Sequence, residues 1–272
     1  MCSRQEYGCQ LRCQQSDGVI CAGFVWSSVI YTAVVTIYIV SEGDVAVANA
    51  VVVLTLIFMA MWSHFVTMTG DPGVVPYGAR PLITLESSEN SPAINMCGYC
   101  DNYKPPGSHH DKKSINRCIS RMDHYCPWMN NVIGAKNQKN FFLFLIYLNL
   151  ATIYMYIIVA LHMVDCGEYD CFNGVSLTLV RVVIFLLLFG MLFTLSMMLS
   201  QAYGLSIGMG TVDRMQNPHK EEDGGLEPVP WGHVFGTYWP AWFLPIEPVF
   251  HDDEEVLKYK VSRHPAVKQT AK

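Results

Sequence analysis

An all-α integral membrane protein, with four spanning helices and a zinc-stabilised cytosolic cysteine-rich domain between the second and third, is the fold class that the sequence predicts. Of the 272 residues, 51% are hydrophobic and only 15% are charged, whereas soluble domains carry about 25% charge. The apolar residues also gather in four long blocks with almost no charge, and each block reaches the roughly 20 residues that cross about 30 Å of hydrocarbon. The net charge of −5 excludes a globally basic nucleic-acid-binding protein.

The four blocks form two predicted helical hairpins. The expected helices span residues 19–40, 45–68, 141–164 and 175–203. Residues 19–68 thus hold the first hairpin and residues 141–203 hold the second. The only charge inside a block is Arg181, whose long side chain can reach the membrane interface from its place near the start of the fourth block. Buried core helices of a soluble protein are the alternative interpretation, which four such blocks separated by charged segments disfavour.

The distribution of lysine and arginine predicts the orientation. The two short links inside the hairpins carry acidic residues only, whereas residues 69–140 hold eight basic residues and residues 204–272 hold seven. Because basic loops stay on the cytosolic side, we expect both of these segments and the N-terminal tail of residues 1–18 to be cytosolic. In the second link, a disulfide between Cys166 and Cys171 and a pair of free thiols are both open interpretations.

The middle domain of residues 69–140 needs a source of order other than a hydrophobic core. Helical periodicity is absent up to about Lys136, and glycine, proline and asparagine are frequent. Because a structureless loop of this length is rare, we expect a metal ion to order it. Cys97 and Cys100 form a Cys-x-x-Cys turn, and the two thiolates of such a turn can reach one Zn²⁺.

The remaining ligands of this metal are expected further along the same domain. His110 and Cys118 would complete a closed Cys₃His site with the two turn cysteines. Closed tetrahedral sites are structural, because no coordination position is left for a reactive water. A disulfide within the turn is disfavoured in a reducing cytosol. His109 competes with His110 for the ligand role, and the sequence spacing does not separate the two.

A second group of reactive side chains follows within four positions. Asp123, His124 and Cys126 lie close to the start of the third predicted span. A thiol becomes a nucleophile when an imidazole takes its proton and a carboxylate holds that imidazole in the useful tautomer. The group therefore predicts acyl transfer through a thioester at the bilayer surface. A metal site that uses His124 and Cys126 is the alternative.

These residues together resemble the family of DHHC-type protein S-acyltransferases, the palmitoyltransferases. Four spans with a cysteine-rich domain between the second and third are also the arrangement of that family. The matching motifs are Asp71-Pro72-Gly73, the run from Cys97 to Phe144 with its core Asp123-His124-Tyr125-Cys126-Pro127-Trp128-Met129-Asn130-Asn131, and the following Gly134 and Asn137. Thr211-Val212-Asp213 and residues 232–245 are looser matches to elements of the family's C-terminal tail. The chain is thus similar to members with an Asp-His-Tyr-Cys motif.

The resemblance implies an enzyme that transfers a long-chain acyl group. Cys126 would take a palmitoyl group from acyl-CoA and pass it to a cysteine of a protein substrate, with His124 as general base and Asp123 orienting it. The implied substrates are cytosolic or membrane-associated proteins with cysteines close to the bilayer. The implied location is the Golgi, the endoplasmic reticulum or the plasma membrane of a eukaryote, as a multi-pass protein.

Acyl-CoA is expected to meet two kinds of side chain. Trp128 and the apolar faces of the spans would enclose the acyl chain, because each buried methylene contributes about 0.8 kcal/mol. The phosphates of the coenzyme need cations, and Arg121, Lys136 and Lys139 lie within plausible reach in the sequence. Solvated surface charge is the alternative for each of these three residues.

The family's second zinc site is the point at which this sequence departs from the pattern. The resemblance places Cys97, Cys100, His110 and Cys118 on the family's first zinc site. The four positions of the second site hold Asp111, a residue near Ile115, Tyr125 and Val132. Tyrosine and valine do not ligate structural zinc, and one aspartate cannot hold the ion alone. We therefore expect one zinc ion where the family has two.

A catalytically inert, zinc-bearing membrane adaptor is the alternative function. Such a scaffold would recruit partners through its tails and would not need a nucleophile. The intact set of Asp123, His124 and Cys126 favours the enzyme.

Overall fold

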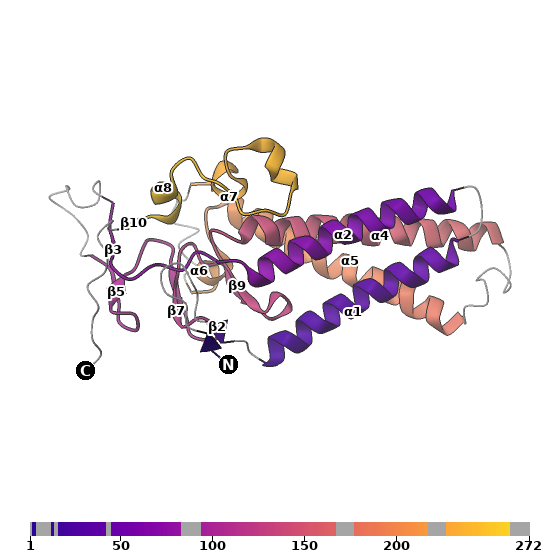
Figure 1. The fold of residues 1–272 in the computed structure, drawn as a ribbon, viewed down its shortest axis with the longest axis horizontal. Helices are drawn as coiled ribbons and strands as arrows, with labels where there is room; N and C mark the ends of the chain where they lie inside the picture. Colours follow the sequence, from indigo (N-terminus) through magenta and orange to yellow (C-terminus); the bar gives the residue numbers. More distant parts are fainter. Residues whose placement is uncertain are drawn as a thin grey trace.

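The computed structural model consists mainly of four long helices with an irregular domain at one end (Figure 1). It describes residues 2–3, 12–13, 16–41, 45–82, 94–166, 177–216 and 227–261. The long helices are α1 (Ser16–Ile39), α2 (Ala46–Thr69), α4 (Gln138–Cys166) and α5 (Leu177–Ser206). Each of the four is long and apolar enough to cross a membrane. The predicted fold class is therefore confirmed. Cys171 lies outside the described residues, so a bridge to Cys166 stays a prediction.

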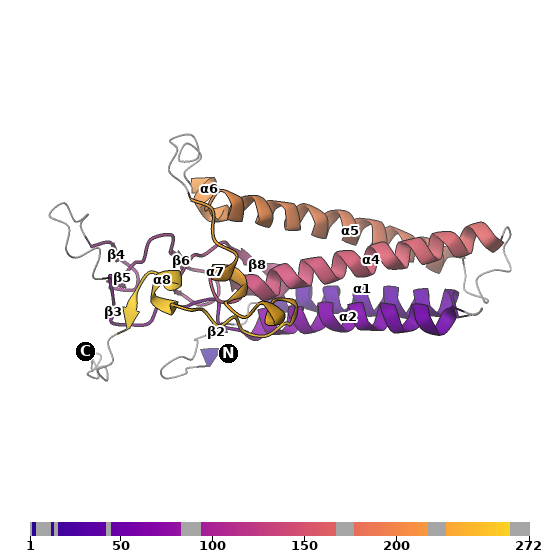
Figure 2. The same cartoon turned by 90° about the horizontal axis from the view of Figure 1, so that it is seen from above.

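Helix α4 is the centre of the bundle. Figure 2 shows it between α5 on one side and the pair α1 and α2 on the other. In its most apolar stretch 61% of the residues are buried inside the protein, against 28% or less in the other three helices. The outer helices therefore turn most of their apolar surface outward, as expected of helices solvated by lipid.

The end of α2 fixes the position at which the middle domain begins. Its hydroxyl side chains, such as those of Ser63 and Thr67, donate hydrogen bonds to carbonyls four residues earlier, so the helix satisfies its own polar groups. Pro72 follows shortly after and cannot continue a helix. The Asp71 carboxylate accepts hydrogen bonds from the backbone amides of Gly73 and Val74, which turns the chain sharply away from the bundle.

The described part of the middle domain contains three short antiparallel hairpins. They pair β4 (Met96–Cys97) with β5 (Asn102–Tyr103), β6 (His109–Asp111) with β7 (Arg117–Ile119), and β8 (His124–Cys126) with β9 (Asn131–Ile133). Strands of two or three residues are too short to be stable alone. Contacts outside each hairpin must therefore supply its stability.

The C-terminal segment folds back over both parts of the protein. Its helices are α6 (Thr211–Gln216), α7 (Gly232–Phe235), the 3-10 helix η4 (Trp239–Phe243) and α8 (Asp253–Leu257). Helix α7 packs on α4, and β10 (Lys260–Val261) pairs with β3 (Ala79–Arg80) at the start of the middle domain. A remaining pair joins β1 (Cys2–Ser3) and β2 (Arg12–Cys13).

Candidate active site and metal centre

Cys126 lies at the tip of a hairpin that enters the helix bundle. This catalytic hairpin consists of β8, the 3-10 helix η1 (Pro127–Met129) and β9. The Cys126 side chain is 2% exposed, and together with Met129 and Ile133 it belongs to the core formed by the long helices. Asn131 fastens the hairpin to α2, because its amide donates to the carbonyls of Thr67 and Gly70. The thiol is thus held at the end of the apolar bundle from which the middle domain extends.

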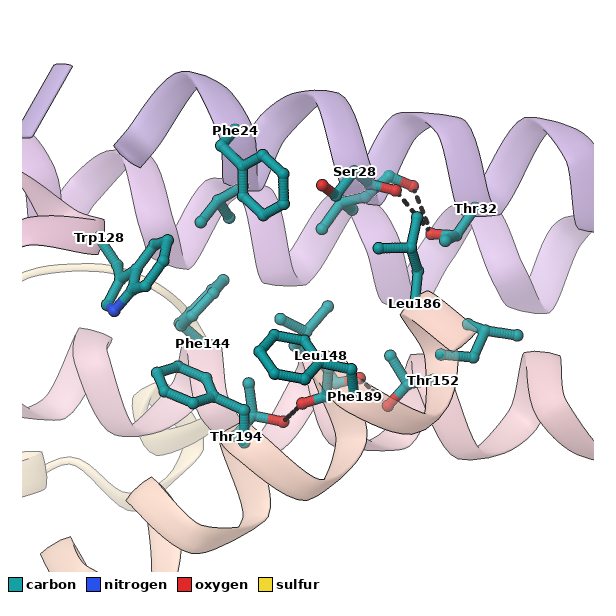
Figure 3. Close-up of a pocket in the computed structure, with 15 residues that line it drawn as sticks. Phe24, Ser28, Thr32, Trp128, Phe144, Leu148, Thr152, Leu186, Phe189 and Thr194 are labelled. Atoms are coloured by element: carbon teal, nitrogen blue, oxygen red, sulfur yellow. Dashed lines mark hydrogen bonds between the residues drawn. The ribbon is translucent and has the colours of Figure 1, made fainter. Parts of the chain in front are cut away.

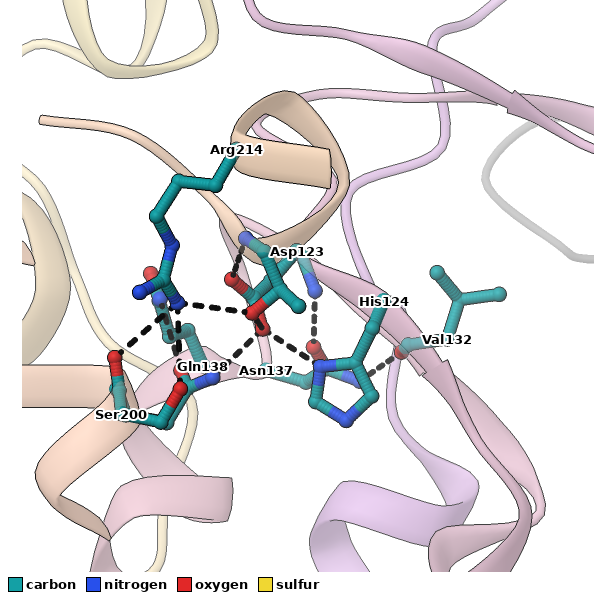
Figure 4. A network of polar contacts seen from close by, with 10 residues as sticks. Asp123, His124, Val132, Asn137, Gln138, Ser200 and Arg214 are labelled. Carbon is teal, nitrogen blue, oxygen red and sulfur yellow. Dashed lines mark hydrogen bonds and ion pairs between the residues drawn. The ribbon is translucent and has the colours of Figure 1, made fainter. Parts of the chain in front are cut away.

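Asp123 is the centre of a buried polar network, which Figure 4 shows. Its Oδ2 contacts Nδ1 of His124 at 2.5 Å and accepts a hydrogen bond of 2.6 Å from the amide of Gln201 in α5. Its Oδ1 accepts a hydrogen bond of 2.8 Å from the backbone amide of Thr211 in α6. Burial alone would raise the pKa of Asp123, but these hydrogen bonds outweigh it and lower the pKa below its ordinary value. The carboxylate is therefore ionised and fixed in position.

His124 and Cys126 project from the same side of strand β8, because residues two apart share a face. Burial alone would lower the pKa of His124. The hydrogen bond with Asp123 and the nearby side chain of Cys126 have the larger combined effect and raise the pKa to about 10. Nε2 of His124 is buried and has no hydrogen-bond partner within the described ranges. The imidazole is thus oriented by Asp123 through one nitrogen and carries a proton on the other at neutral pH.

The metal centre is built by the other two hairpins. Cys97 ends β4 and Cys100 lies in the turn that follows it, while His110 and Cys118 are direct cross-strand partners in the β6–β7 pair. The four ligand atoms all lie within 4.8 Å of one another. No other group of three or more potential ligands occurs among the residues that the structure describes.

The distances within this cluster fit a zinc ion. Ligand sulfurs about 2.3 Å and nitrogens about 2.0 Å from a tetrahedral Zn²⁺ lie roughly 3.5–3.8 Å from one another. Here the Cys100 and Cys118 sulfurs are 3.8 Å apart, and Nδ1 of His110 lies 3.6 Å from the Cys97 sulfur and 3.1 Å from the Cys100 sulfur. Three thiolates and one imidazole are also a usual donor set for structural zinc. The chain therefore holds one Cys₃His cluster suited to this metal.

The structure shows which of the two neighbouring histidines, His109 or His110, belongs to the metal cluster. The side chain of His110 points into the cluster, and its second nitrogen contacts the Asn116 side-chain oxygen at 3.2 Å. Ligand histidines are commonly oriented by such a partner. His109 projects from the opposite face of the strand, where its Nε2 contacts the Asp213 carboxylate of α6 at 2.9 Å. His109 therefore links the middle domain to the C-terminal segment and lies outside the cluster.

Three of the four positions expected to correspond to the family's second zinc site lie in one apolar cluster. Ile115 and Val132 are buried with Ile119 and Met122, and Tyr125 packs against them. Tyr125 and Val132 are cross-strand partners in the catalytic hairpin. The fourth position, Asp111, instead accepts hydrogen bonds from the backbone amides of the turn that follows it.

A cavity lies between α1, α4 and α5, and Trp128 stands at one end of it (Figure 3). Side chains such as Phe24, Phe144, Leu187 and Phe193 line it. Most of its wall is therefore hydrocarbon. The hydroxyls of Thr32, Thr152 and Thr194 also face the cavity, but each donates to a carbonyl of its own helix. The cavity thus offers an apolar slot that begins beside the catalytic hairpin.

The three cations expected to meet coenzyme phosphates are all engaged within the protein. The Arg121 guanidinium donates to Gln138 and to the His233 carbonyl. Lys139 is completely buried, and its amine donates to the carbonyls of Ala241 and Ile246. Arg121 and Lys139 therefore tie the C-terminal segment to the active-site end of the bundle.

Lys136 is placed differently from the other two cations. Its side chain is partly exposed, and its amine lies 3.4 Å from the Asp71 carboxylate. That contact joins the residue to the turn after α2.

Gln201 is the functional residue that sequence reasoning missed most clearly. It lies in the last two turns of α5, 3% exposed, and bonds directly to the Asp123 carboxylate. A polar amide in an otherwise apolar block was the signal that could have revealed it. Thr211, which the sequence places in a loosely matching tail element, also binds Asp123.

The comparisons with known proteins agree with this geometry. Residues 90–218 match the family described as DHHC palmitoyltransferase. The chain is 31% identical to Palmitoyltransferase ZDHHC3 of Homo sapiens over 245 residues, which cover 83% of this chain and 81% of that protein. It is 35% identical to Palmitoyltransferase ZDHHC7 of Mus musculus over 185 residues, 65% of this chain and 60% of that protein. Probable protein S-acyltransferase 13 of Arabidopsis thaliana is 41% identical over 111 residues, 36% of each chain.

The similarity to the mammalian relatives extends well beyond the cysteine-rich segment, since it covers most of both chains. It agrees with the four apolar helices, with the Cys₃His cluster between the second and third of them, and with the cysteine at the bundle end. The chain belongs to the DHHC palmitoyltransferase family and is a multi-pass membrane protein palmitoyltransferase similar to ZDHHC3 and ZDHHC7.

Proposed function

We propose that Cys126 is the residue that carries the acyl group during the reaction. The observation that supports this most directly is the juxtaposition of three features at one place. The Asp123–His124 pair orients an imidazole on the same strand as the thiol, two residues before it, and Trp128, which lines the apolar cavity, follows the thiol by two residues. A thioester formed at Cys126 can therefore keep its carbonyl beside the imidazole while its hydrocarbon chain enters the bundle.

The reaction follows in two balanced steps. In the first, the Cys126 thiolate attacks the thioester carbonyl of palmitoyl-CoA, the bond to the coenzyme sulfur breaks, and the departing thiolate takes the proton from Nε2 of His124. In the second, neutral His124 takes the proton of the substrate cysteine, whose thiolate attacks the acyl group and releases the Cys126 thiolate. Asp123 holds the imidazole in place throughout and stabilises its charged form.

The zinc cluster has a structural part in this proposal. A bound zinc ion would hold the two metal-binding hairpins together through Cys97, Cys100, His110 and Cys118. Because all four donors come from the protein, no position remains at which substrate could bind the metal. The hairpins in turn support the segment from which Asp123 and the catalytic hairpin extend.

We place the middle domain and both tails in the cytosol. The lysines and arginines within positions 69–140 and 204–272 support this orientation. Acyl-CoA is also a cytosolic compound. Protein substrates would present cysteines close to the bilayer, since Cys126 lies at the end of the apolar bundle. The membrane would be the Golgi, the endoplasmic reticulum or the plasma membrane. Of the three expected cations, we retain Lys136 as the candidate for coenzyme phosphate. Its side chain is partly exposed, whereas Lys139 is buried and the Arg121 guanidinium is held by hydrogen bonds within the protein.

Labelling of the purified full-length protein with palmitoyl-CoA tests this function. We expect a protein-bound acyl group that neutral hydroxylamine removes, because hydroxylamine cleaves thioesters. A protein that binds zinc but takes no label under these conditions would instead fit the inert adaptor.

We further propose that this Asp-His-Tyr-Cys member binds a single zinc ion. The apolar cluster around Tyr125 and Val132 supports it, because packed hydrocarbon occupies the place of the second set of ligands. Elemental analysis of the purified protein is expected to give a zinc-to-protein ratio near one. The ratio should remain near one in Tyr125→His, because one histidine without three partners cannot hold zinc.

Tyr125→Phe is the matched control for this prediction. Its ring keeps the packing of the cluster, and it removes only a hydroxyl that has no hydrogen-bond partner within the described ranges. We expect this variant to be as stable as the wild type or slightly more stable. A ratio near two in the wild type would contradict the single-zinc proposal.

The cavity also predicts how acyl-chain preference can be changed. Gly190 lines the cavity, and a Cβ built on it meets nothing closer than the Thr152 methyl group at 3.9 Å. Gly190→Leu should therefore fill space in the cavity without displacing backbone. Because about two methylenes would lose their place, we expect the preference between palmitoyl- and myristoyl-CoA to shift by roughly tenfold toward the shorter chain. Competition between the two acyl-CoAs measures it.

Gly23→Leu provides the control for this substitution. Gly23 is an exposed position of α1 with no heavy atom within 4 Å of a Cβ built there, and it does not line the cavity. The same gain in helix propensity and apolar surface should leave the chain preference unchanged. If both variants shift the preference equally, the cavity does not determine the preference for acyl-chain length.

A further inference from the structure

His64 is a completely buried histidine in the membrane-spanning part of α2 that the reaction above does not use. It lies five residues before the end of α2, which is roughly 8 Å along the helix axis. Its ring packs edge-on against Phe144 of α4 at a centroid distance of 5.3 Å. An imidazole at this depth needs partners for both nitrogens, because unsatisfied polar groups are costly in an apolar bundle.

Both nitrogens of His64 have a partner, and the two partners differ in kind. The indole nitrogen of Trp26 in α1 donates to Nδ1 at 3.1 Å. Nε2 lies 3.0 Å from the backbone carbonyl oxygen of Trp128 in η1. Since an indole N–H can only donate, Nδ1 must be the acceptor. The single ring proton therefore lies on Nε2 and is donated to the Trp128 carbonyl, so the neutral form of His64 satisfies all three groups.

This arrangement supports the part of the catalytic hairpin that is hardest to stabilise. Irregular backbone at membrane depth is tolerated only where its polar groups find partners inside the protein. The turn of η1 lies at that depth, among the side chains of the bundle core. His64 supplies a donor to one of its carbonyls, and Trp26 fixes the ring that supplies it. Helices α1 and α2 are thereby both joined to the turn that follows Cys126.

The anchored residue is also the one at the entrance of the cavity. The Trp128 ring packs against Phe24 of α1 and Phe193 of α5, with centroid distances of 6.4 and 5.8 Å. A shift of the Trp128 backbone would therefore move both the cavity entrance and the thiol two residues earlier.

We propose that His64, held by Trp26, is a positioning residue that sets the placement of Trp128 and hence of Cys126 relative to the acyl cavity. The proposal deepens the function given above and rests on Cys126 as acyl acceptor. It requires a hydrogen-bond acceptor and a hydrogen-bond donor in one side chain at this position. Misplacement of reacting groups by about 1 Å can slow a reaction by up to about 100-fold, so the effect should appear in the acylation step.

The test compares His64→Phe with His64→Gln in the purified full-length protein. Phenylalanine keeps an aromatic ring but removes both hydrogen bonds, whereas the glutamine amide can accept from Trp26 and donate to the Trp128 carbonyl. We expect His64→Phe to lower the maximal rate of self-acylation about tenfold, with little change in the palmitoyl-CoA concentration for half-maximal rate. It should also weaken the discrimination among myristoyl-, palmitoyl- and stearoyl-CoA. His64→Gln should restore most of the rate and the discrimination.

Further variants separate positioning from simple loss of stability. Trp26→Phe leaves the His64 ring in place without its orienting donor, and we expect a rate loss of about threefold. The double variant Trp26→Phe/His64→Phe should be no slower than His64→Phe alone, because the two residues act through one contact. Ser63→Ala is the matched control, since Ser63 is equally buried in α2 but its hydroxyl donates to the Met59 carbonyl of its own helix.

The rate and the chain discrimination of the His64 variants decide whether His64 positions Trp128. A His64→Phe protein with wild-type rate and chain discrimination overturns it, and so does a His64→Gln protein that is as slow as His64→Phe. If His64→Phe fails to fold, Trp26→Phe and His64→Gln still carry the test, and wild-type discrimination in Trp26→Phe overturns the role of the pair. A label that survives in Cys126→Ser, measured in parallel, would instead overturn the acyl acceptor itself.

Discussion

Replacement of Cys126 by serine is expected to abolish the hydroxylamine-sensitive acyl label, with a loss of about three orders of magnitude or more in the rate of self-acylation. Serine has nearly the same shape as cysteine, but its hydroxyl is a poor nucleophile that the His124 imidazole does not ionise to a useful degree. Labelling with palmitoyl-CoA followed by hydroxylamine treatment measures the loss. The variant should keep its zinc and its thermal unfolding temperature.

Cys21→Ser is the matched control for this experiment. Cys21 is a half-buried free thiol in the first turns of α1, and its replacement should leave the label intact. If instead Cys126→Ser kept a thioester label and Cys21→Ser lost it, the acceptor would be misassigned.

The second large effect is expected from loss of a metal ligand. Cys118→Ala should unfold the middle domain and abolish activity, because the free energy of binding a structural zinc ion, about 10–16 kcal/mol in small domains, is free energy of folding for hairpins this short. Limited proteolysis measures the change. We expect new cleavage sites between Thr69 and Lys136, together with loss of zinc, and the same outcome for Cys97→Ala and Cys100→Ala.

Cys126→Ser distinguishes this loss of fold from a loss of chemistry. We expect both variants to be inactive, but Cys126→Ser should resist the protease as the wild type does, since the thiol belongs to the bundle core and not to the metal cluster. Equal protease resistance of the metal-ligand variants and the wild type would remove the structural role of zinc.

Much of the architecture could be predicted because it depends on composition over long stretches. Four apolar blocks are enough to predict four spanning helices, whatever their neighbours are. The metal cluster was also accessible, because its ligands lie within about twenty residues of one another. The choice between His109 and His110 was not accessible, since it depends on which residue lies opposite Cys118 in a hairpin. Adjacent residues of a strand point to opposite faces.

The contacts between distant segments could not be predicted from local patterns. Gln201 and Thr211 donate hydrogen bonds to Asp123 from 78 and 88 positions further along the chain. No motif near Asp123 predicts these contacts. Lys139 has the sequence neighbourhood of a surface cation but is buried under the C-terminal segment. In both cases the fold of the whole chain decides the role of the side chain.

The attachment of Asp123 to α5 and α6 has a practical consequence for biochemical work. A soluble fragment of residues 94–136 would retain all four metal ligands and the three reacting side chains. It would lack Gln201 and Thr211, which hold the carboxylate, and the helices that surround the thiol. Such a fragment could bind zinc while its acid, imidazole and thiol were no longer aligned. Inhibitors that depend on the aligned site therefore have to be sought with the whole membrane protein, and a screen against the excised domain would select compounds for a different arrangement of the same atoms.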